Sequence, residues 1–190
     1  MLTDGSYRKM ATLNMGKRVM IRFLNGQDRD KLINFFQQVP IADIEFCKHD
    51  VKNPKVVDHW LGSENFLSIM SLVASDIGTD QIVASLNLYI GQQAVQNVGD
   101  IHQIIVSRPY QGLGLGSLML DELINIALKE KLHWLKVEIA TELKNVLKAF
   151  KSKGFEIKAI LEDYFRDHKG QTHDGALMML PLITKDIKAF

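Results

Sequence analysis

The chain has 190 residues, of which 46% are hydrophobic and 24% are charged, a size and composition typical of one compact domain. Its formal net charge of +1 argues against a dedicated nucleic-acid or membrane-surface binder, because such proteins carry a strongly basic face. No apolar run approaches the length of a membrane span and the first residues lack the apolar centre of a secretion signal, so we expect a cytoplasmic protein.

The N-terminal part is expected to hold a loose leader, a strand and a helix. Residues 1–16 are polar with scattered methionines and form the expected leader, and the single domain is expected to cover 17–190. Apolar residues alternate over 17–24, which is the period of a half-buried strand. Asp28 is expected to cap a helix that ends at Pro40. The core-facing stripe of this helix is Leu32, Ile33, Phe35 and Phe36.

The central part predicts a second short helix and a run of antiparallel strands. Two apolar runs are separated by a turn around Gly78, and a further turn precedes a third run. A mixed α+β sheet follows from this order of elements. The helix is expected at 56–61, the strands at 66–74, 82–90 and 101–106, and the turns at 76–80 and 97–100.

The most informative segment is a glycine-rich turn, Gln111–Gly116, with the sequence QGLGLG. It separates the third of these strands from a long amphipathic helix expected at 117–130. Glycines let the backbone approach an anion, and the first N–H groups of a helix have no intrahelical partner. The positive end of the helix dipole points to the same place. The turn therefore predicts a phosphate site.

Spacing separates the classes of protein that bind phosphate in such a turn. A P-loop needs a lysine directly after its last glycine, and no lysine lies between Gly112 and Leu128, which excludes it. A Rossmann dinucleotide site needs a third glycine where this chain has Ser117. Glu138 lies at a suitable distance downstream for a ribose contact, so the Rossmann site remains an alternative. The antiparallel strands before the turn count against it, because a Rossmann turn normally opens the first βαβ unit.

The turn instead matches the pyrophosphate loop of the GNAT acetyltransferases, [Q/R]-x-x-G-x-[G/A], through Gln111, Gly114 and Gly116. The resemblance covers roughly residues 98–182 and is only architectural before that. It implies an α+β GNAT fold with a mixed six- to seven-stranded central sheet, about four helices and a splayed fourth and fifth strand pair. Residues 134–139 resemble the family's fifth strand. Residues 145–155 resemble the helix that closes the cofactor groove and ends in Gly-Phe, and residues 159–178 resemble the final hairpin.

The resemblance implies that acetyl-CoA is the co-substrate and that no metal takes part. The backbone of the strand before the turn would bind the pantetheine arm. The N–H groups of the turn would bind the pyrophosphate, with the side chain of Gln111 as a further donor. The later helix would add a hydrogen bond from Asn145 and the ring of Phe150. The cofactor-binding residues implied in this way are Ile104, Ile105, Val106, Gln111, Gly112, Leu113, Gly114, Leu115, Gly116, Ser117, Asn145 and Phe150.

The reaction implied is direct transfer of an acetyl group to a primary amine of a small molecule, an amino acid or a protein. The amine must lose a proton before it attacks, and relatives place a carboxylate for this on the strand that here carries Asp100 and His102. Alternation puts His102 on the same face as Ile104 and Val106, where an imidazole suits a base; a structural histidine is the alternative. Neither nucleic acid nor membrane is expected as a partner, and a homodimer is compatible with the resemblance.

The general acid departs from the family pattern. Many members carry a tyrosine four residues before the glycine of Gly-Phe, and this chain has Phe150 there. A phenyl ring cannot donate a proton. The alternatives are that the thiolate leaves unassisted, that another group such as Tyr164 donates, or that the chain is a non-catalytic acyl-CoA-binding or regulatory domain.

Other residues carry two interpretations each. Cys47 and His49 suggest a thiol nucleophile, but direct transfer needs none, so a bystander cysteine in a reducing compartment is the better interpretation. His168 and His173 lack metal-ligand spacing, which favours a solvated hairpin turn. Acceptor contacts are expected from 38–60 and 163–174. Four aromatic residues line either the acceptor pocket or the core: Phe35, Phe36, Trp60 and Phe66. Three basic residues either contact the phosphates of the cofactor or carry surface charge: Arg108, Lys148 and Lys151.

Overall fold

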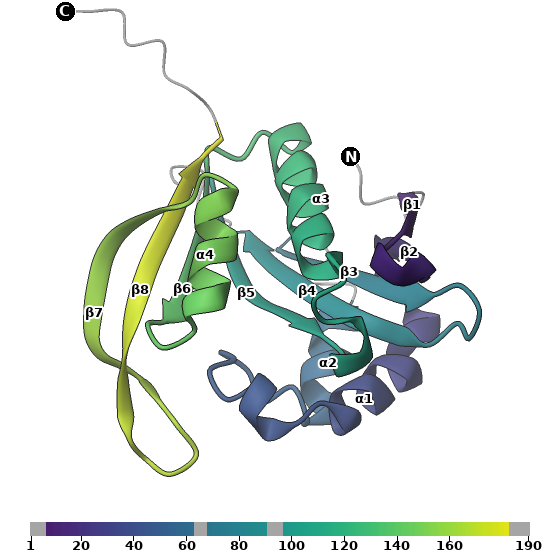
Figure 1. Cartoon of the computed structure of the whole chain (residues 1–190), viewed down its shortest axis with the longest axis horizontal. Helices are drawn as coiled ribbons and strands as arrows, with labels where there is room; N and C mark the ends of the chain where they lie inside the picture. Colours follow the sequence, from purple (N-terminus) through teal and green to yellow (C-terminus); the bar gives the residue numbers. More distant parts are fainter. Residues whose placement is uncertain (1–6, 63–67, 91–96, 183–190) are drawn as a thin grey trace, which may run out of the picture.

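The computed structural model describes residues 7–62, 68–90 and 97–182, which form one mixed eight-stranded sheet with helices on both faces (Figure 1). The strand order is β1-β2-β3-β4-β5-β6-β8-β7, and among these strands β5 and β6 form the parallel pair. The strands are β1 Arg8–Thr12, β2 Arg18–Phe23, β3 Ile69–Asp76, β4 Ile82–Ile90, β5 Val98–Val106, β6 Trp134–Ala140, β7 Glu156–Arg166 and β8 Thr172–Pro181. The α-helices are α1 Arg29–Gln38, α2 Pro54–Leu61, α3 Leu115–Lys129 and α4 Lys144–Ser152.

Two apolar cores lie on opposite faces of the sheet. Buried side chains of α3 and α4, such as Leu123 and Phe150, pack on one face. Buried side chains of α1 and α2, such as Phe36 and Trp60, pack on the other face. The α+β fold expected from the sequence is confirmed, and its antiparallel meander of β3, β4 and β5 excludes the Rossmann alternative. No helix in the described part of the chain is long and apolar enough to cross a membrane.

The strand β1 corrects the expectation of a loose leader over 1–16. Residues 8–12 pair antiparallel with β2, from Arg8 opposite Arg22 to Thr12 opposite Arg18. Four of the five residues are exposed, so the strand lacks the apolar alternation that would reveal it in the sequence. It is an edge strand that pairs with β2 and whose Lys9 also contacts Glu122 of α3, and it raises the strand count to eight.

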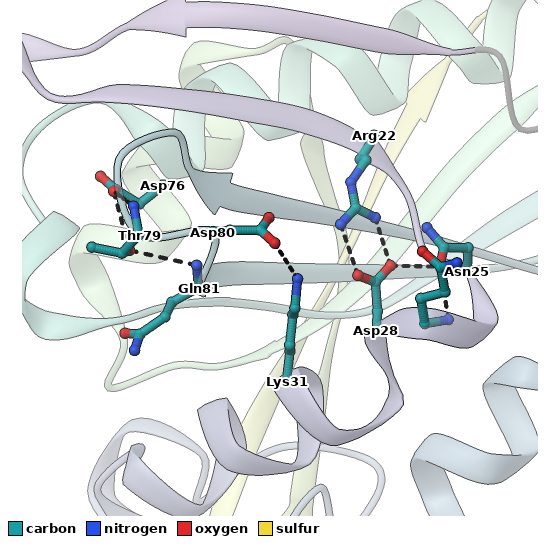
Figure 2. A network of polar contacts seen from close by, with 9 residues as sticks. Arg22, Asn25, Asp28, Lys31, Asp76, Thr79, Asp80 and Gln81 are labelled. Atoms are coloured by element: carbon teal, nitrogen blue, oxygen red, sulfur yellow. Dashed lines mark hydrogen bonds and ion pairs between the residues drawn. The ribbon is translucent and has the colours of Figure 1, made fainter.

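The start of α1 differs from the expected cap. Asp28 precedes the helix, but its carboxylate makes no cap hydrogen bond to α1. Figure 2 shows it instead between the guanidinium of Arg22, at 2.5 and 2.7 Å, and the backbone N–H of Asn25, at 3.0 Å. Lys31 pairs with Asp80 in the turn that joins β3 to β4. These contacts fix the first turns of α1 to the sheet.

A β-bulge in β5 decides which side chains face the site. Asn87 of β4 lies opposite Gln103, but the next residue, Leu88, lies opposite Ile101, so β5 contains one extra residue, His102. A row of buried polar side chains crosses the sheet at this level, because Asn87 donates to Ser71 at 2.8 Å and accepts from Gln103 at 3.3 Å. The bulge therefore shifts the alternation of faces along β5.

The strands β5 and β6 part as the resemblance implies. Their pairing runs only from Val98 opposite Trp134 to Ile101 opposite Val137, and the ribbons diverge beyond it (Figure 1). We call the end of this pairing the splay point. The strand begins at Val98, so the turn expected at 97–100 is wrong. Gly99 is needed for close packing inside the strand and not for a turn, since a Cβ there would lie 2.8 Å from side chains of β4 and β6. Beyond the splay point, among the described strands, the backbone of 102–106 has no strand partner on the β6 side.

Candidate active site

The glycine turn builds an open cradle at the N-terminus of α3. Gly112 and Gly114 have φ values of 71° and 91°, the left-handed region that strains other residues. The first turn closes with the Leu118 N–H donating to the carbonyl of Gly114, which leaves the N–H groups of 115–117 without intrahelical partners. A Cβ built on Gly112 or Gly114 would meet nothing within 4 Å. The cradle therefore has free donors, the positive end of a helix dipole and space for a phosphate group.

The side chain of Gln111 ties the turn to its strand. Its Nε2 donates to the carbonyl of Val106 at 2.9 Å and to Asp43 Oδ2 at 3.4 Å. Arg108 donates to the same carboxylate at 3.3 Å, although its side chain is 63% exposed. The Gln111 amide, which was expected to reach a pyrophosphate, thus binds groups of the protein that fix the turn. The positive charge of Arg108 is balanced by Asp43.

The remaining cofactor candidates divide between the two faces of the sheet. Ile104 and Val106 pack against the core under α3, and Ile105 belongs to the opposite core, so their free backbone rather than their side chains faces the parted strands. Asn145 is exposed in the first turn of α4, as are Lys148 and Lys151 further along that helix.

Phe150 is a core residue. It is 4% exposed and stacks edge-on against Phe155, with ring centroids 5.0 Å apart. From the resemblance, this ring was expected beside the cofactor groove. Its burial supports the packing role instead, because the ring fills the space between α4 and the sheet.

A charged cavity of about 540 Å³ lies at the splay point. The residues from β5 and β6 that line it flank the last paired positions of the two strands. The other walls come from the segment between α1 and α2 and from β7, which belong to the segments expected to contact an acceptor. The lining residues are Glu45, Phe46, Cys47, Lys48, Asp100, His102, Lys136, Glu138, Tyr164, Phe165 and Arg166.

For the aromatic residues weighed between the acceptor pocket and the core, the structure supports the core. Phe35, Phe36 and Trp60 are buried in the core between α1, α2 and the sheet. Phe66 lies outside the described residues. Phe46 and Phe165, which line the charged cavity, were not among the candidates, and their rings meet edge-on at 5.6 Å.

Two lysines and two carboxylates form an ion cluster in the cavity. Lys48 Nζ lies 3.1 Å from Asp100 and 2.6 Å from Glu138 Oε2. Lys136 Nζ lies 3.0 Å from Asp100 Oδ2 and 3.6 Å from Glu138 Oε1. The side chains of Asp100 and Glu138 are only 18% and 9% exposed.

The cluster keeps both carboxylates ionised. Burial alone would raise the pKa of Asp100, but His102 and the ammonium groups of Lys48 and Lys136 outweigh it and lower the pKa. Burial likewise opposes ionisation of Glu138, and Lys48 again lowers the pKa below its ordinary value. The splay point therefore carries two ionised carboxylates near neutral pH, balanced by the ammonium groups of Lys48 and Lys136.

Most of this cluster was not predicted from the sequence. Glu138 was predicted only as an alternative ribose ligand, and neither Lys48 nor Lys136 was predicted for the site. The alternation along β6 contains a usable signal, because the polar residues Lys136 and Glu138 alternate with the buried Leu135, Val137 and Ile139 and so share a face. No comparable local signal marks Lys48, which meets the cluster from a distant segment.

His102 lies in the cavity wall, but not on the expected face. Its ring stacks on Tyr89 with centroids 3.8 Å apart and planes 12° apart, and Tyr89 packs on the core of α1 and α2. The prediction that His102 shares a face with Ile104 and Val106 is wrong, because the bulge turns it toward the opposite face. Its Nε2 lies 3.4 Å from Asp100 Oδ2 and its Nδ1 lies 3.0 Å from His49 Nε2.

Tyr164 brings a hydroxyl to the cavity that Phe150 lacks. Burial, together with its hydrogen bond to the Glu138 carboxylate, raises the pKa of Tyr164, so the phenol stays protonated near neutral pH. Gly175 of β8 leaves room for its ring, since a Cβ there would lie 2.9 Å from Tyr164 Cδ1. The position of the tyrosine thus depends on a glycine in the neighbouring strand.

The other singled-out residues have structural partners. Burial raises the pKa of the Cys47 thiol to about 12, which suits a bystander rather than a nucleophile. His168 contacts Glu45, and His173 lies 2.5 Å from Glu142 and 3.3 Å from Asp167. His168 lies in the hairpin turn with its side chain 56% exposed, as expected, whereas His173 lies in β8 and is only 20% exposed.

Comparison with known proteins places these features in a wider group. The family model described as Acetyltransferase (GNAT) family matches residues 36–155, more than half of the chain. A search of curated proteins gave no match. Among solved structures, the ribosomal-protein-S18-alanine N-acetyltransferase of Escherichia coli superposes with a TM-score of 0.70 at 18% identity, covering 90% of this chain and 99% of that chain.

Two further structures resemble the chain to the same degree. The ribosomal-protein-S5-alanine acetyltransferase of Vibrio fischeri has a TM-score of 0.75 at 15% identity and covers 90% of this chain and 96% of its own. The protein yncA of Salmonella typhimurium, solved with its cofactor acetyl-CoA, has a TM-score of 0.74 at 16% identity and covers 95% of this chain and 98% of its own. At these identities the likeness concerns the fold.

Proposed function

This chain belongs to the GNAT family of acetyltransferases, and from that membership we propose that it transfers an acetyl group from acetyl-CoA directly to a primary amine. The acceptor is a small molecule, an amino acid or a protein. The observation that carries the proposal is the arrangement of two sites along β5, with the open glycine cradle after its last residue and the charged cavity at its splay point.

The residues present fit the co-substrate. The N–H groups of 115–117 would hold its pyrophosphate, and the backbone of 104–106, which has no partner from β6, would bind its pantetheine arm, with Asn145 at the start of α4 as a further donor. When bound, acetyl-CoA supplies an acetyl group activated as a thioester. The adjacency of the cradle to β5 supports this orientation, because Gln111 links the turn to the carbonyl of Val106.

The charged cavity would receive the amine. The carboxylates of Asp100 and Glu138, which are now paired with lysines, would hold the ammonium group of the acceptor in the place that Lys48 Nζ takes between them. The amine attacks only after losing a proton, and His102 is the group in the cavity wall that suits this base role. The protonated hydroxyl of Tyr164 would donate to the departing thiolate in place of the tyrosine replaced by Phe150.

A second candidate function is a non-catalytic acyl-CoA-binding or regulatory domain. Phe150 favours this second function, because its buried phenyl ring gives α4 no hydroxyl group at the position where many relatives carry a tyrosine. The two functions differ in one measurable step, which is transfer of the acetyl group.

Two measurements test the proposal in order. Isothermal titration with CoA, acetyl-CoA and NAD should give binding of the first two and none of the third. Single-turnover reactions with acetyl-CoA and a panel of amines, amino acids and peptides with N-terminal alanine should then yield an acetylated acceptor faster than a reaction without protein. Binding of CoA without transfer to any acceptor would favour the regulatory domain, and binding of NAD alone would overturn both candidates.

A further inference from the structure

His49 is the imidazole that contacts His102, and the proposed reaction gives it no role of its own. It lies in the segment between α1 and α2, where its Nε2 is 3.0 Å from His102 Nδ1. The two rings are 5.1 Å apart at 31°, and the ring of Tyr89 stacks on both, at 3.8 Å from His102 and 5.4 Å from His49. Trp60 fixes Tyr89 by donating its indole N–H to the phenol oxygen at 2.7 Å.

This packing holds His102 in one orientation. Its Nδ1 edge points at His49, and its Nε2 edge points at Asp100 and the cavity. The 3.0 Å separation is a hydrogen bond and needs one hydrogen between the two nitrogens, whereas 3.4 Å between Nε2 and Asp100 is beyond normal hydrogen-bond length. Asp100 is already paired with the ammonium groups of Lys48 and Lys136, so it does not depend on a hydrogen from His102.

The hydrogen between the two histidines decides which nitrogen of His102 is basic. If it belongs to His102 Nδ1, the lone pair of neutral His102 lies on Nε2 and faces the cavity. If it belongs to His49 Nε2, the lone pair of His102 is turned away from the cavity. After His102 takes a proton both of its nitrogens carry hydrogens, and only an accepting His49 then keeps the bond. An accepting His49 therefore serves both states of His102 without changing its own tautomer.

We propose that His49 is a positioning residue, whose Nε2 accepts the Nδ1 hydrogen of His102 and thereby leaves the basic lone pair of His102 on Nε2. This role rests on the proposed N-acetyltransferase function. In that reaction the proton leaves the amine nitrogen of the acceptor and forms a bond to His102 Nε2, next to the negative charge of Asp100. The Nδ1 hydrogen stays on His102 throughout and remains shared with His49.

The surroundings of His49 favour its neutral form, which the accepting role requires. The charged or titratable groups that face it are His102 from β5, Tyr89 from β4, His59 from α2 and Lys48 from its own segment. Burial first, and then the positive charges of His102, His59 and Lys48, lower the pKa of His49 below its ordinary value. His49 therefore keeps a lone pair at a pH where a solvent-exposed histidine begins to lose it.

The direct test is the tautomer of His102 in the protein without ligands. Long-range proton–nitrogen NMR spectra at pH 8 should show the hydrogen of His102 on Nδ1 in the parent protein. His49→Gln should keep it there, because the amide oxygen can accept it, whereas His49→Leu should move it to Nε2. A parent protein with the hydrogen on Nε2, or a His49→Leu variant with the parent's tautomer, would overturn the proposal.

Kinetics provides the second readout. We expect His49→Leu to lower kcat by about 100-fold, the scale of a lost general base, with an unchanged KM for acetyl-CoA. His49→Gln should retain most of the parent kcat. Equal losses in both variants would mean that His49 only packs, and circular dichroism with thermal unfolding checks that both variants fold. Because the NMR test needs neither acetyl-CoA nor an acceptor, failure of the proposed function and failure of the His49 role give different results.

Discussion

The glycine cradle and the charged cavity lie along the same strand but are built in opposite ways. The cradle is made of consecutive backbone groups, held by two glycines in the left-handed region and by the start of α3. The cavity is made of side chains from β5, β6, β7 and the segment between α1 and α2. A local sequence pattern can encode the first, whereas the second depends on how distant segments meet. The two regions should therefore respond separately to substitution.

The largest effect is expected from Gly114→Glu in the cradle. Its backbone has a φ of 91°, which costs a non-glycine residue about 1–3 kcal/mol, and the added carboxylate would occupy the phosphate position with like charge. We expect the dissociation constant for CoA to rise by about 100-fold or more, as measured by isothermal titration. Circular dichroism should show that the fold is retained.

Gly170→Glu is the matched control for this substitution. Gly170 also has a positive φ, 83°, and open space around its Cβ position, but it lies in the turn between β7 and β8. It should carry the same backbone strain and leave CoA binding unchanged. Equal loss of affinity in both variants would mean that strain, and not the phosphate cradle, explains the result.

The same contrast explains what could be predicted from the sequence. The QGLGLG turn, the following helix and the parted strands were predicted because each depends on a local pattern or on the family resemblance that the pattern reveals. The edge strand β1 was missed because polar residues at a sheet edge have no apolar alternation. The face of His102 was predicted wrongly, since a single extra residue in β5 reverses the alternation and leaves no mark in composition.

The charged cavity could be predicted only in part. Its β5 and β7 members Asp100, His102 and Tyr164 were candidates, because the resemblance pointed to their positions. Lys48 meets Asp100 across 52 residues of sequence, and its place depends on the course of the segment between α1 and α2. Side chains that pair across such separations are set by packing, which one sequence without its structure does not reveal.

His102→Ala tests the cavity at its proposed base. We expect kcat/KM to fall by about 100-fold, the usual contribution of a general base, with an unchanged dissociation constant for CoA. His133→Ala is the control, because His133 is an exposed histidine before β6. A near-normal rate in His102→Ala, or a loss equal to its loss of folded protein, would show that His102 is structural and would leave Asp100 or water as the base.

A smaller effect is expected from Tyr164→Phe. The substitution removes the hydroxyl beside Glu138 and keeps the ring that packs against Gly175. If this hydroxyl protonates the departing thiolate, kcat should fall by about tenfold, less than for a lost base because the thiolate is itself a good leaving group. The KM for acetyl-CoA should not change. A parent-like kcat would indicate that the thiolate leaves unassisted.

The smallest effect concerns stability in acid, and it isolates the ion cluster from catalysis. The pKa of Asp100 is lowered in the folded protein, because His102 and the two lysine partners outweigh the effect of burial. Between the folded and the ordinary pKa of Asp100, the unfolded chain therefore binds more protons at this site. The stability contributed by Asp100 is therefore fully present above about pH 5 and is lost as the pH falls through the ordinary range of an aspartate toward the folded value.

Urea unfolding at pH 7 and pH 3 should show a smaller loss of unfolding free energy in Asp100→Asn than in the parent. Asp30→Asn, at a side chain that is 93% exposed, should behave like the parent. An identical pH dependence in all three proteins would mean that the cluster at the splay point does not hold Asp100 ionised.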